Sequence, residues 1–232
     1  MSFWKQKFRY NETVCTLLAD KKEAIDAAID SIKHNRRQLD VYCRCHPHFL
    51  ESLEPVPVPP EPPIAKLMAE AARTASVGPM AAVAGALADL AVKAMESTGC
   101  KVAVVENGGE VSAISDQTID VALSAGDSEF SKRFGFRLTD FPVGIATSSG
   151  VFSHALSFGD AEAVTIFSSN AALADAAATA VCNVVKGGNP RKAIEFGLRK
   201  ALSIDGVKGV LIIYQKLVGT AGNIPQIIKV NL

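Results

Sequence analysis

The 232-residue chain has no excess of charge of either sign, because 24 Lys and Arg residues are balanced by 24 Asp and Glu residues. Proteins that bind nucleic acid or an anionic membrane surface through their electrostatic field carry a basic excess or a basic patch. The charge balance favours neither partner. We therefore expect that the chain binds no nucleic acid and no membrane.

Long apolar runs are also absent. The most apolar expected helix, Met80–Val92, is interrupted by Asp89 and is shorter than the ~20 residues that span a bilayer. The first residues, Met1–Lys7, are not followed by the apolar stretch of a secretory signal. We expect a soluble, cytoplasmic protein.

Aromatic residues make up only 6% of the chain, whereas hydrophobic residues make up 48%, so the core must be built from Ala, Val, Ile and Leu. A chain of this length buries enough apolar surface for one large domain. We expect a single domain over residues 1–232. A proline-rich linker at 55–63 separates an N-terminal strand–helix segment from the main body, since each proline fixes φ and blocks helix.

The five cysteines are an odd number and form no disulfide framework. Two of them belong to a cluster of soft or borderline metal ligands, Cys43, Cys45, His46 and His48. Zinc sites usually combine such a group with a distant second pair of ligands, which this sequence lacks. We therefore expect that the cluster is not a structural zinc site, and its role stays open.

The apolar periodicity predicts alternating groups of strands and helices. Strands are expected at 8–18 (or two strands joined by a turn at Asn11), 101–105, 110–115, 119–124, 143–147, 163–167, 209–214 and 226–230. Helices are expected at 20–38, 39–45 (or to 52), 64–76, 80–97, after Asn170, and at 190–202. Hairpin-like strand pairs and paired helices favour an α+β fold, with antiparallel sheets layered with paired helices, over a doubly wound sheet.

The helix after Asn170 carries the most informative pattern. It is nearly all Ala, Val and Leu, but Asp175, Thr179 and Asn183 interrupt it at a spacing of four and so share one face. A carboxylate, a hydroxyl and the phosphate oxygens of a ligand are typical partners of Mg²⁺, which predicts a metal site. Alternatively, the helix dipole stabilises the Asp and the Thr bonds back to its own helix. Both interpretations stay open on the helix alone.

Two turns are candidate ligand contacts. Asn107-Gly108-Gly109-Glu110 is typical of a tight hairpin, but paired glycines also let a ligand approach the backbone. Thr147-Ser148-Ser149-Gly150 is either a polar turn or a cradle of N–H groups for a phosphate. Ser149, Ser153 and His154 raise a hydrolase hypothesis, but the G-x-S-x-G pattern is absent and Asp160 is the only obvious orienting acid.

Taken in order, four segments resemble the FAD:protein FMN transferase (ApbE-type) family, over about residues 75–185. They are Met80–Asp89, Glu106–Glu110, Thr147–Gly150 and Ala174–Ala180. The whole chain, with its Val77–Gly85 signature and its proline-rich linker, looks closer to a shorter ApbE-related branch of that superfamily. The resemblance implies an ApbE-like, T-fold-like α+β architecture. Members bind FAD and Mg²⁺, transfer FMN to a Thr of a target protein and release AMP.

The resemblance also implies roles for individual residues. Asp175 and Thr179 are implied metal ligands. The implied flavin-nucleotide site is lined by the first turn, Asn107, Gly108, Gly109 and Glu110, with the second turn, Thr147, Ser148, Ser149 and Gly150, near it. No catalytic residue is identified.

Two departures from the family pattern matter. The transferases carry a Lys-Gly-Tyr where this chain has Ala84-Gly85-Ala86, which removes a cation and an aromatic ring from the flavin site. Their His and Asp-Pro segment is shortened here to Ser153–Asp160. We therefore expect Mg²⁺-dependent binding of FAD, FMN or a similar phosphorylated ligand, with slow or absent transfer. A flavin carrier or sensor and a metal-dependent nucleotide phosphohydrolase remain alternatives, and the acceptor protein and any homo-oligomer stay open.

Overall fold

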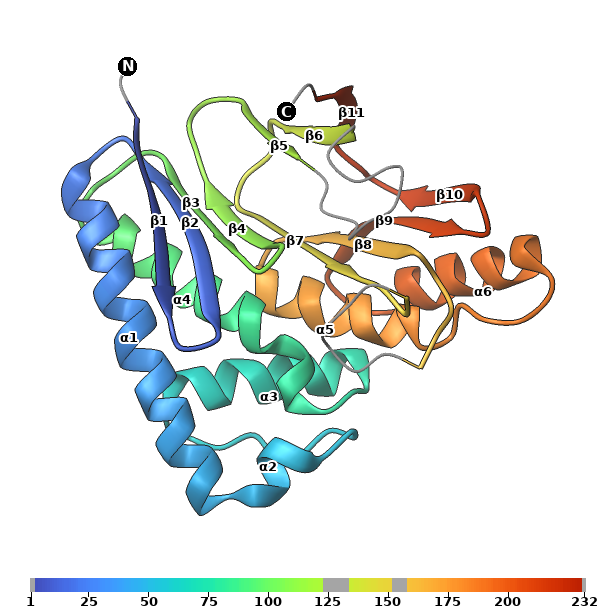
Figure 1. Cartoon of the computed structure of the whole chain (residues 1–232), viewed down its shortest axis with the longest axis horizontal. Coiled ribbons are helices and arrows are strands. Elements are labelled where there is room, and N and C mark those ends of the chain that lie inside the picture. Colours follow the sequence, from blue (N-terminus) through green and yellow to red (C-terminus); the bar gives the residue numbers. More distant parts are fainter. Residues whose placement is uncertain (1–2, 123–133, 152–157, 231–232) are drawn as a thin grey trace.

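The computed structural model describes residues 3–122, 134–151 and 158–230, and its main element is an eight-stranded antiparallel sheet (Figure 1). The strand order is β1-β2-β3-β4-β7-β8-β9-β10. The strands are β1 (Trp4–Tyr10), β2 (Thr13–Ala19), β3 (Ala103–Asn107), β4 (Glu110–Ile114), β7 (Val143–Ser148), β8 (Ala163–Ser168), β9 (Val207–Tyr214) and β10 (Leu217–Gly222). The N-terminal hairpin β1–β2 pairs directly with β3, so the segments before and after the proline-rich linker share one sheet.

One face of this sheet is covered by a row of helices, each above a pair of strands (Figure 1). They are α1 (Lys22–Cys45) on β1 and β2, α4 (Val83–Glu96) on β3 and β4, α5 (Ala171–Cys182) on β7 and β8, and α6 (Pro190–Leu202) on β9 and β10. Three further helices, α2 (Pro47–Glu51), α3 (Pro63–Ala75) and η1 (Pro79–Ala82), link α1 to α4. The order hairpin, helices, hairpin therefore occurs twice along the chain.

The opposite face carries a smaller sheet of order β11-β6-β5, made of β11 (Gln226–Lys229), β6 (Phe134–Leu138) and β5 (Ile119–Ala122). Phe136 of β6 meets Phe167 of β8 edge to face, with ring centroids 4.8 Å apart. Such pairs add stabilisation beyond the area that they bury. The expected α+β fold, with antiparallel sheets layered with paired helices, is confirmed.

Several expected boundaries were wrong. The two helices predicted at 20–38 and 39–45 form the single helix α1, because no helix breaker separates them. Strand β10 was not predicted, since four of its six residues are exposed and it contains two glycines. Residues 134–138, for which no strand was predicted, form β6. The predicted turn at Asn11 is confirmed by its positive φ of 53°, whereas residues 123 and 124 of the strand expected at 119–124 lie outside the described residues.

Helices α4 and α5 meet closely at the centre of the helical layer. A Cβ atom at Gly85 would overlap the backbone carbonyl of Ala171, so this crossing requires glycine. The Asp89 carboxylate on α4 accepts from the N–H groups of Ala171 and Ala172, both at 2.9 Å, at the start of α5. In return, Asp175 Oδ2 on α5 accepts from the Gly85 N–H at 3.0 Å, at the start of α4. Each helix therefore supplies the carboxylate that caps the other.

Within the described ranges, no single helix combines the length and apolar composition needed to cross a membrane. The consecutive pair Pro63–Ala75 and Pro79–Glu96 passes that test jointly, by length and composition only, with a bend of 103°.

The capping pattern predicts that Asp89→Ala destabilises the fold. The variant leaves two N–H groups of α5 without their acceptor, and it removes the partner of the Ser112 hydroxyl, which donates to Asp89 Oδ1 at 2.7 Å. We expect the free energy of unfolding, measured with urea, to fall by about 1–3 kcal/mol. The control Asp26→Ala removes an exposed carboxylate from α1 and should change it little. Equal stabilities of the two variants would contradict the capping role.

Candidate functional site

Asp175, on α5, lies against the start of α4, close to the turn between β3 and β4. Its Oδ2 accepts from the Gly85 N–H at 3.0 Å. Burial raises the pKa of the Asp175 carboxyl well above its usual value, and the negative charge of nearby Glu110 raises it further, against the lowering effect of the backbone N–H groups of Gly85 and Ala84. The ionised form of this carboxyl is therefore only partly compensated by its hydrogen bonds.

Glu110, the first residue of β4, is the second carboxyl of this site. Burial raises the pKa of Glu110 to about 7, with a further contribution from the charge of Glu106. Glu110 and Asp175 therefore disfavour each other's ionisation. A bound cation would relieve both costs, so the pair has the electrostatic character of a cation site.

The turn between β3 and β4 is tied to the same place. Asn107 Nδ2 donates to the carbonyl of Ala84 at 2.9 Å. Gly108 and Gly109 have positive φ values of 69° and 120°, which a tight hairpin requires and glycine supplies without strain. Hairpin geometry thus accounts for both glycines, and the turn still lies beside the residues that bind Asp175.

Thr179 and Asn183 continue the face of Asp175 along α5, and we call these three residues the α5 stripe. From Asp175 to Asn183 the stripe spans roughly 12 Å, at ~1.5 Å per residue. Thr179 and Asn183 line a cavity of about 440 Å³. Its other lining residues are Leu50, Ser52, Leu53, Val77, Gly78, Met80, Ala81, Val83 and Phe158. This cavity adjoins the start of α4 and is within the size range of small-molecule sites.

The second predicted turn reaches the far end of the stripe. A Cβ at Gly150 would overlap the carbonyl of Gly159, and a Cβ at Gly159 would overlap the carbonyl of Cys182 at the end of α5. The Ser149 hydroxyl accepts from the Val151 N–H at 3.1 Å. The glycine therefore serves close packing here, and the turn lies at the Asn183 end of the stripe.

The predicted site residues are not all brought together. Asn107, Gly108, Gly109 and Glu110 lie near Asp175, whereas Ser148, Ser149 and Gly150 lie toward the opposite end of α5. Thr147 lies on the sheet face that points away from α5, where its hydroxyl is 2.9 Å from that of Thr165. Ser153 and His154 lie outside the described residues.

Sequence reasoning missed the contacts of three residues in this region. Asp89 was noted as an interruption of an apolar helix and as the end of the Met80–Asp89 segment, but not as a cap of α5, although a lone carboxylate in such a helix signals a buried partner. Asn183 was noted for its spacing, but not as the acceptor of the Phe158 N–H at 2.9 Å. Phe158 was not considered, because a single aromatic residue in a loop carries no pattern.

The donor set suits a hard cation. In the described part of the chain, no group of three or more His, Cys, Asp or Glu side chains is arranged to hold a metal ion. Mg²⁺ needs fewer, since it commonly takes one or two carboxylates and completes its shell with waters and substrate phosphates. Asp175, Thr179 and the adjacent Glu110 fit that requirement.

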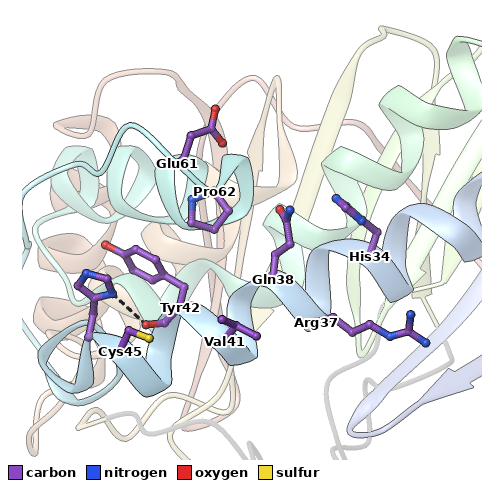
Figure 2. Close-up of a pocket in the computed structure, with 9 residues that line it drawn as sticks. His34, Arg37, Gln38, Val41, Tyr42, Cys45, Glu61 and Pro62 are labelled. Carbon is purple, nitrogen blue, oxygen red and sulfur yellow. Dashed lines mark hydrogen bonds between the residues drawn. The ribbon is translucent and has the colours of Figure 1, made fainter.

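The Cys–His cluster lies elsewhere, beside a hollow of about 570 Å³ between α1 and Glu61–Pro62 (Figure 2). The His46 ring stacks on Tyr42 with centroids 4.2 Å apart, and its Nδ1 is 3.0 Å from the Tyr42 carbonyl oxygen. Cys43 is buried, and burial raises the pKa of its thiol, whereas Cys45 is exposed. The cluster therefore does not present its thiols to one point.

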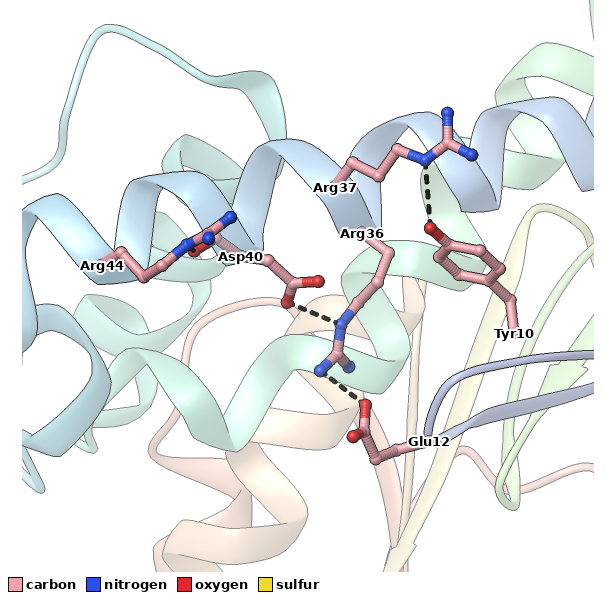
Figure 3. Close-up of polar contacts among 6 residues, drawn as sticks. All are labelled: Tyr10, Glu12, Arg36, Arg37, Asp40 and Arg44. Carbon is pink, nitrogen blue, oxygen red and sulfur yellow. Dashed lines mark hydrogen bonds and ion pairs between the residues drawn. The ribbon is translucent and has the colours of Figure 1, made fainter.

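The arginines near this hollow have structural partners (Figure 3). Arg36 donates to Glu12 at 2.8 Å and to Asp40 at 3.0 Å, and Arg37 Nε donates to the Tyr10 hydroxyl at 3.0 Å. These contacts fasten the β1–β2 hairpin to α1.

Comparison with known proteins assigns the chain to a family. The family model described as AbpE bacteria matches residues 5–206. The chain is 38% identical to a UPF0280 protein of Methanosarcina acetivorans, over 98% of this chain and 90% of the relative. It is 40% identical to a UPF0280 protein of Methanopyrus kandleri, over 95% and 91% of the two chains.

Solved structures show the same fold at low sequence identity. The apo flavinyl transferase ApbE of Pseudomonas stutzeri superimposes with a TM-score of 0.60 at 13% identity, over 95% of this chain and 94% of that one. The ApbE protein of Thermotoga maritima also gives a TM-score of 0.60, at 12% identity over 94% and 96% of the two chains. The chain therefore belongs to the AbpE bacteria family, an ApbE-related family, and has the fold of the ApbE flavinyl transferases.

Proposed function

We propose that the chain binds a flavin nucleotide, FAD or FMN, or a similar phosphorylated ligand, together with Mg²⁺. Asp175 and Thr179 would hold the cation. The observation that carries the proposal is the pair of carboxyls with raised pKa values, Asp175 and Glu110, together with Thr179, which lies one helical turn from Asp175 on α5 and lines a cavity. When bound, the cation neutralises the phosphate charge of the ligand.

Residues along the α5 stripe and beside it would then have separate roles in orienting the carboxylate, holding the turn and enclosing the ligand. Asp175 is oriented by the N–H of Gly85, which keeps its carboxylate at the start of α4. The Asn107 amide holds the β3–β4 turn against Ala84. Met80, Ala81 and Val83 supply apolar walls next to Thr179, which exclude water from the ligand.

We expect this chain to retain ligand binding better than catalysis of FMN transfer. Ala84 and Ala86 occupy the positions at which the ApbE-type transferases carry Lys and Tyr, and Ala86 is fully buried. Binding that is equal in the ground and transition states does not accelerate a reaction, which needs groups that meet developing charge. A flavin carrier or sensor is the second candidate, and this substitution favours it.

We expect that protein incubated with FAD, Mg²⁺ and a transferase's target peptide transfers FMN slowly or not at all, about 10²-fold or more below a transferase. The measurement is AMP release together with the mass of the peptide. Rapid stoichiometric flavinylation would contradict the reduced activity. Release of AMP and FMN without peptide modification would indicate the phosphohydrolase, and a saturable change in flavin fluorescence without AMP would indicate the carrier or sensor.

For Asp175→Asn we expect loss of the Mg²⁺-dependent part of nucleotide binding, by at least about tenfold in Kd measured by calorimetry. Asparagine keeps an acceptor for the Gly85 N–H, so the fold is spared, while the charge that attracts the cation is removed. Asp89→Asn is the matched control, because Asp89 caps the neighbouring helix in the same way. Equal Mg²⁺ dependence in wild type and Asp175→Asn would rule out the metal role.

The raised pKa of Glu110 predicts a pH-dependent stability. Its pKa is 4.5 in its ordinary state and about 7 in the fold. The stabilisation from the protonated carboxyl is therefore complete below about pH 4.5 and is lost as the pH rises through about 7. Without added metal, Glu110→Gln should exceed wild type in unfolding free energy by about 1–2 kcal/mol at pH 8 and match it at pH 5.

Thermal unfolding at the two pH values measures this effect, and Glu195→Gln on the exposed face of α6 serves as its control. Added Mg²⁺ at pH 8 should stabilise wild type more than Glu110→Gln. If Glu110→Gln were less stable than wild type at pH 8, the ionised Glu110 carboxylate would not destabilise the fold, and the prediction would be wrong.

A further inference from the structure

The strand β1 forms an open edge of the large sheet. It stands first in the strand order, and β2 is its only strand partner in the described part of the chain (Figure 1). Every second residue of such an edge strand turns its backbone N–H and C=O groups away from the sheet. β1 has seven residues and contains no proline, which would interrupt this row of groups. The backbone of this edge is therefore able to pair with another strand.

The side chains of β1 separate into an aromatic face and a cationic face. The aromatic face lies toward α1, because cationic groups of that helix lie 5.7–5.9 Å from the centroids of its three rings. The residues of this face are Trp4, Phe8 and Tyr10, with Gln6 among them. Since successive side chains alternate across a strand, Lys5, Lys7 and Arg9 lie on the opposite face.

The three cations of β1 are exposed, and none of them forms an ion pair within the described ranges. The carboxylate in register with Lys7 belongs to Glu106 on β3, two strand spacings or about 9.6 Å away. Glu106 accepts instead from the Gly109 N–H at 2.9 Å. The positive charge of this row is therefore not neutralised by a direct contact with another described residue.

Protection of the edge does not account for all of these features. Lysines on an edge strand discourage unwanted pairing between copies of a protein. However, β1 also exposes apolar surface, since Trp4 is 51% exposed and the preceding Phe3 is 38% exposed. The other edge strand of the sheet, β10, carries no charged residue at all. The charge is thus concentrated on one edge, beside aromatic rings.

We propose that β1 binds an extended segment of another protein in which acidic and apolar residues alternate. The segment would add one strand to the sheet through its backbone. Its carboxylates would lie beside Lys5, Lys7 and Arg9, and its apolar side chains beside the aromatic face, because cross-strand neighbours of opposite charge and of apolar character stabilise a sheet. The alternation of the segment follows directly from the two faces of β1.

Other occupants fit this edge less well. In a second copy of the chain, β1 against β1 would bring cations beside cations, and β10 offers no carboxylate. A nucleic acid matches the charge, but it has no peptide N–H and C=O groups to pair with the open edge. An acidic peptide strand satisfies both the charges and the backbone.

The fluorescence of Trp4, the only tryptophan of the chain, reports directly on binding at β1. The first probe is a seven-residue peptide of alternating Glu and Val, and the second has the same composition with Glu and Val in separate blocks. The protein variant combines Lys5→Glu with Lys7→Glu. Its matched control combines Lys186→Glu with Lys192→Glu, which reverses two exposed lysines elsewhere. A urea melt verifies that both variants fold.

We expect the alternating peptide to bind wild type and the control, and the block peptide to bind more weakly. The Lys5→Glu, Lys7→Glu variant should weaken binding of the alternating peptide by about tenfold or more. A peptide of alternating Lys and Val should bind this variant in preference to wild type. Equal affinity of the alternating peptide for the variant and the control would show that the inference is wrong.

Two N-methylated forms of the alternating peptide separate strand pairing from simple charge attraction. Methyl groups on the N–H of every Glu block one edge of the peptide, and methyl groups on the N–H of every Val block the other edge. Pairing with β1 uses one edge, so one form should bind and the other should not. Equal binding by the two forms would contradict strand pairing.

Two further outcomes would overturn the proposal. A single-stranded oligonucleotide that binds at Trp4, with no binding of the alternating peptide, would assign the cations to nucleic acid. Self-association of a Lys5→Ser, Lys7→Ser variant in sedimentation, again with no peptide binding to wild type, would show that the cations only protect the edge.

Discussion

The exchange of carboxylate caps between α4 and α5 is the interaction on which the rest of the structure depends. Asp89 closes the start of α5 and Asp175 bonds to the start of α4, while Gly85 lets the two helices touch at the backbone. These helices lie on the central strands of the sheet, β3 and β4 on one side and β7 and β8 on the other. The caps therefore join the two hairpin–helix–hairpin halves at the point where the candidate site lies.

The same exchange gives Asp175 two roles that have opposite effects on the stability of its carboxylate. As a cap, its carboxylate is stabilised by backbone N–H groups and by the positive end of the α4 dipole. Beside Glu110 in a partly buried site, it is destabilised by desolvation and by the charge of Glu110. The second effect prevails, since the pKa of Asp175 is raised. A structural carboxylate alone gains nothing from a nearby Glu110, whereas a cation-binding site gains affinity from both charges.

Local chemistry made part of this architecture predictable from the sequence. The four-residue spacing of Asp175, Thr179 and Asn183 placed them on one helix face, and the Asn107-Gly108 pair marked a hairpin at the correct position. What could not be predicted depends on contacts between distant segments. The capping role of Asp89 needs Ala171, the glycine at 78 needs Ser52, and β10 is recognisable only through its pairing with β9. The opposite orientation of Thr147 follows from sheet register, which the turn sequence does not encode.

The central claim is that Asp175 and Thr179 bind a divalent cation together with a nucleotide. Crystals grown with FAD and Mn²⁺, an anomalous scatterer that takes the place of Mg²⁺, test it most directly. We predict an anomalous peak bonded to the Asp175 carboxylate and the Thr179 hydroxyl, with a ligand phosphate completing the coordination shell of the metal. A bound nucleotide without a peak at these residues, or a peak at a different group of acids, would contradict it.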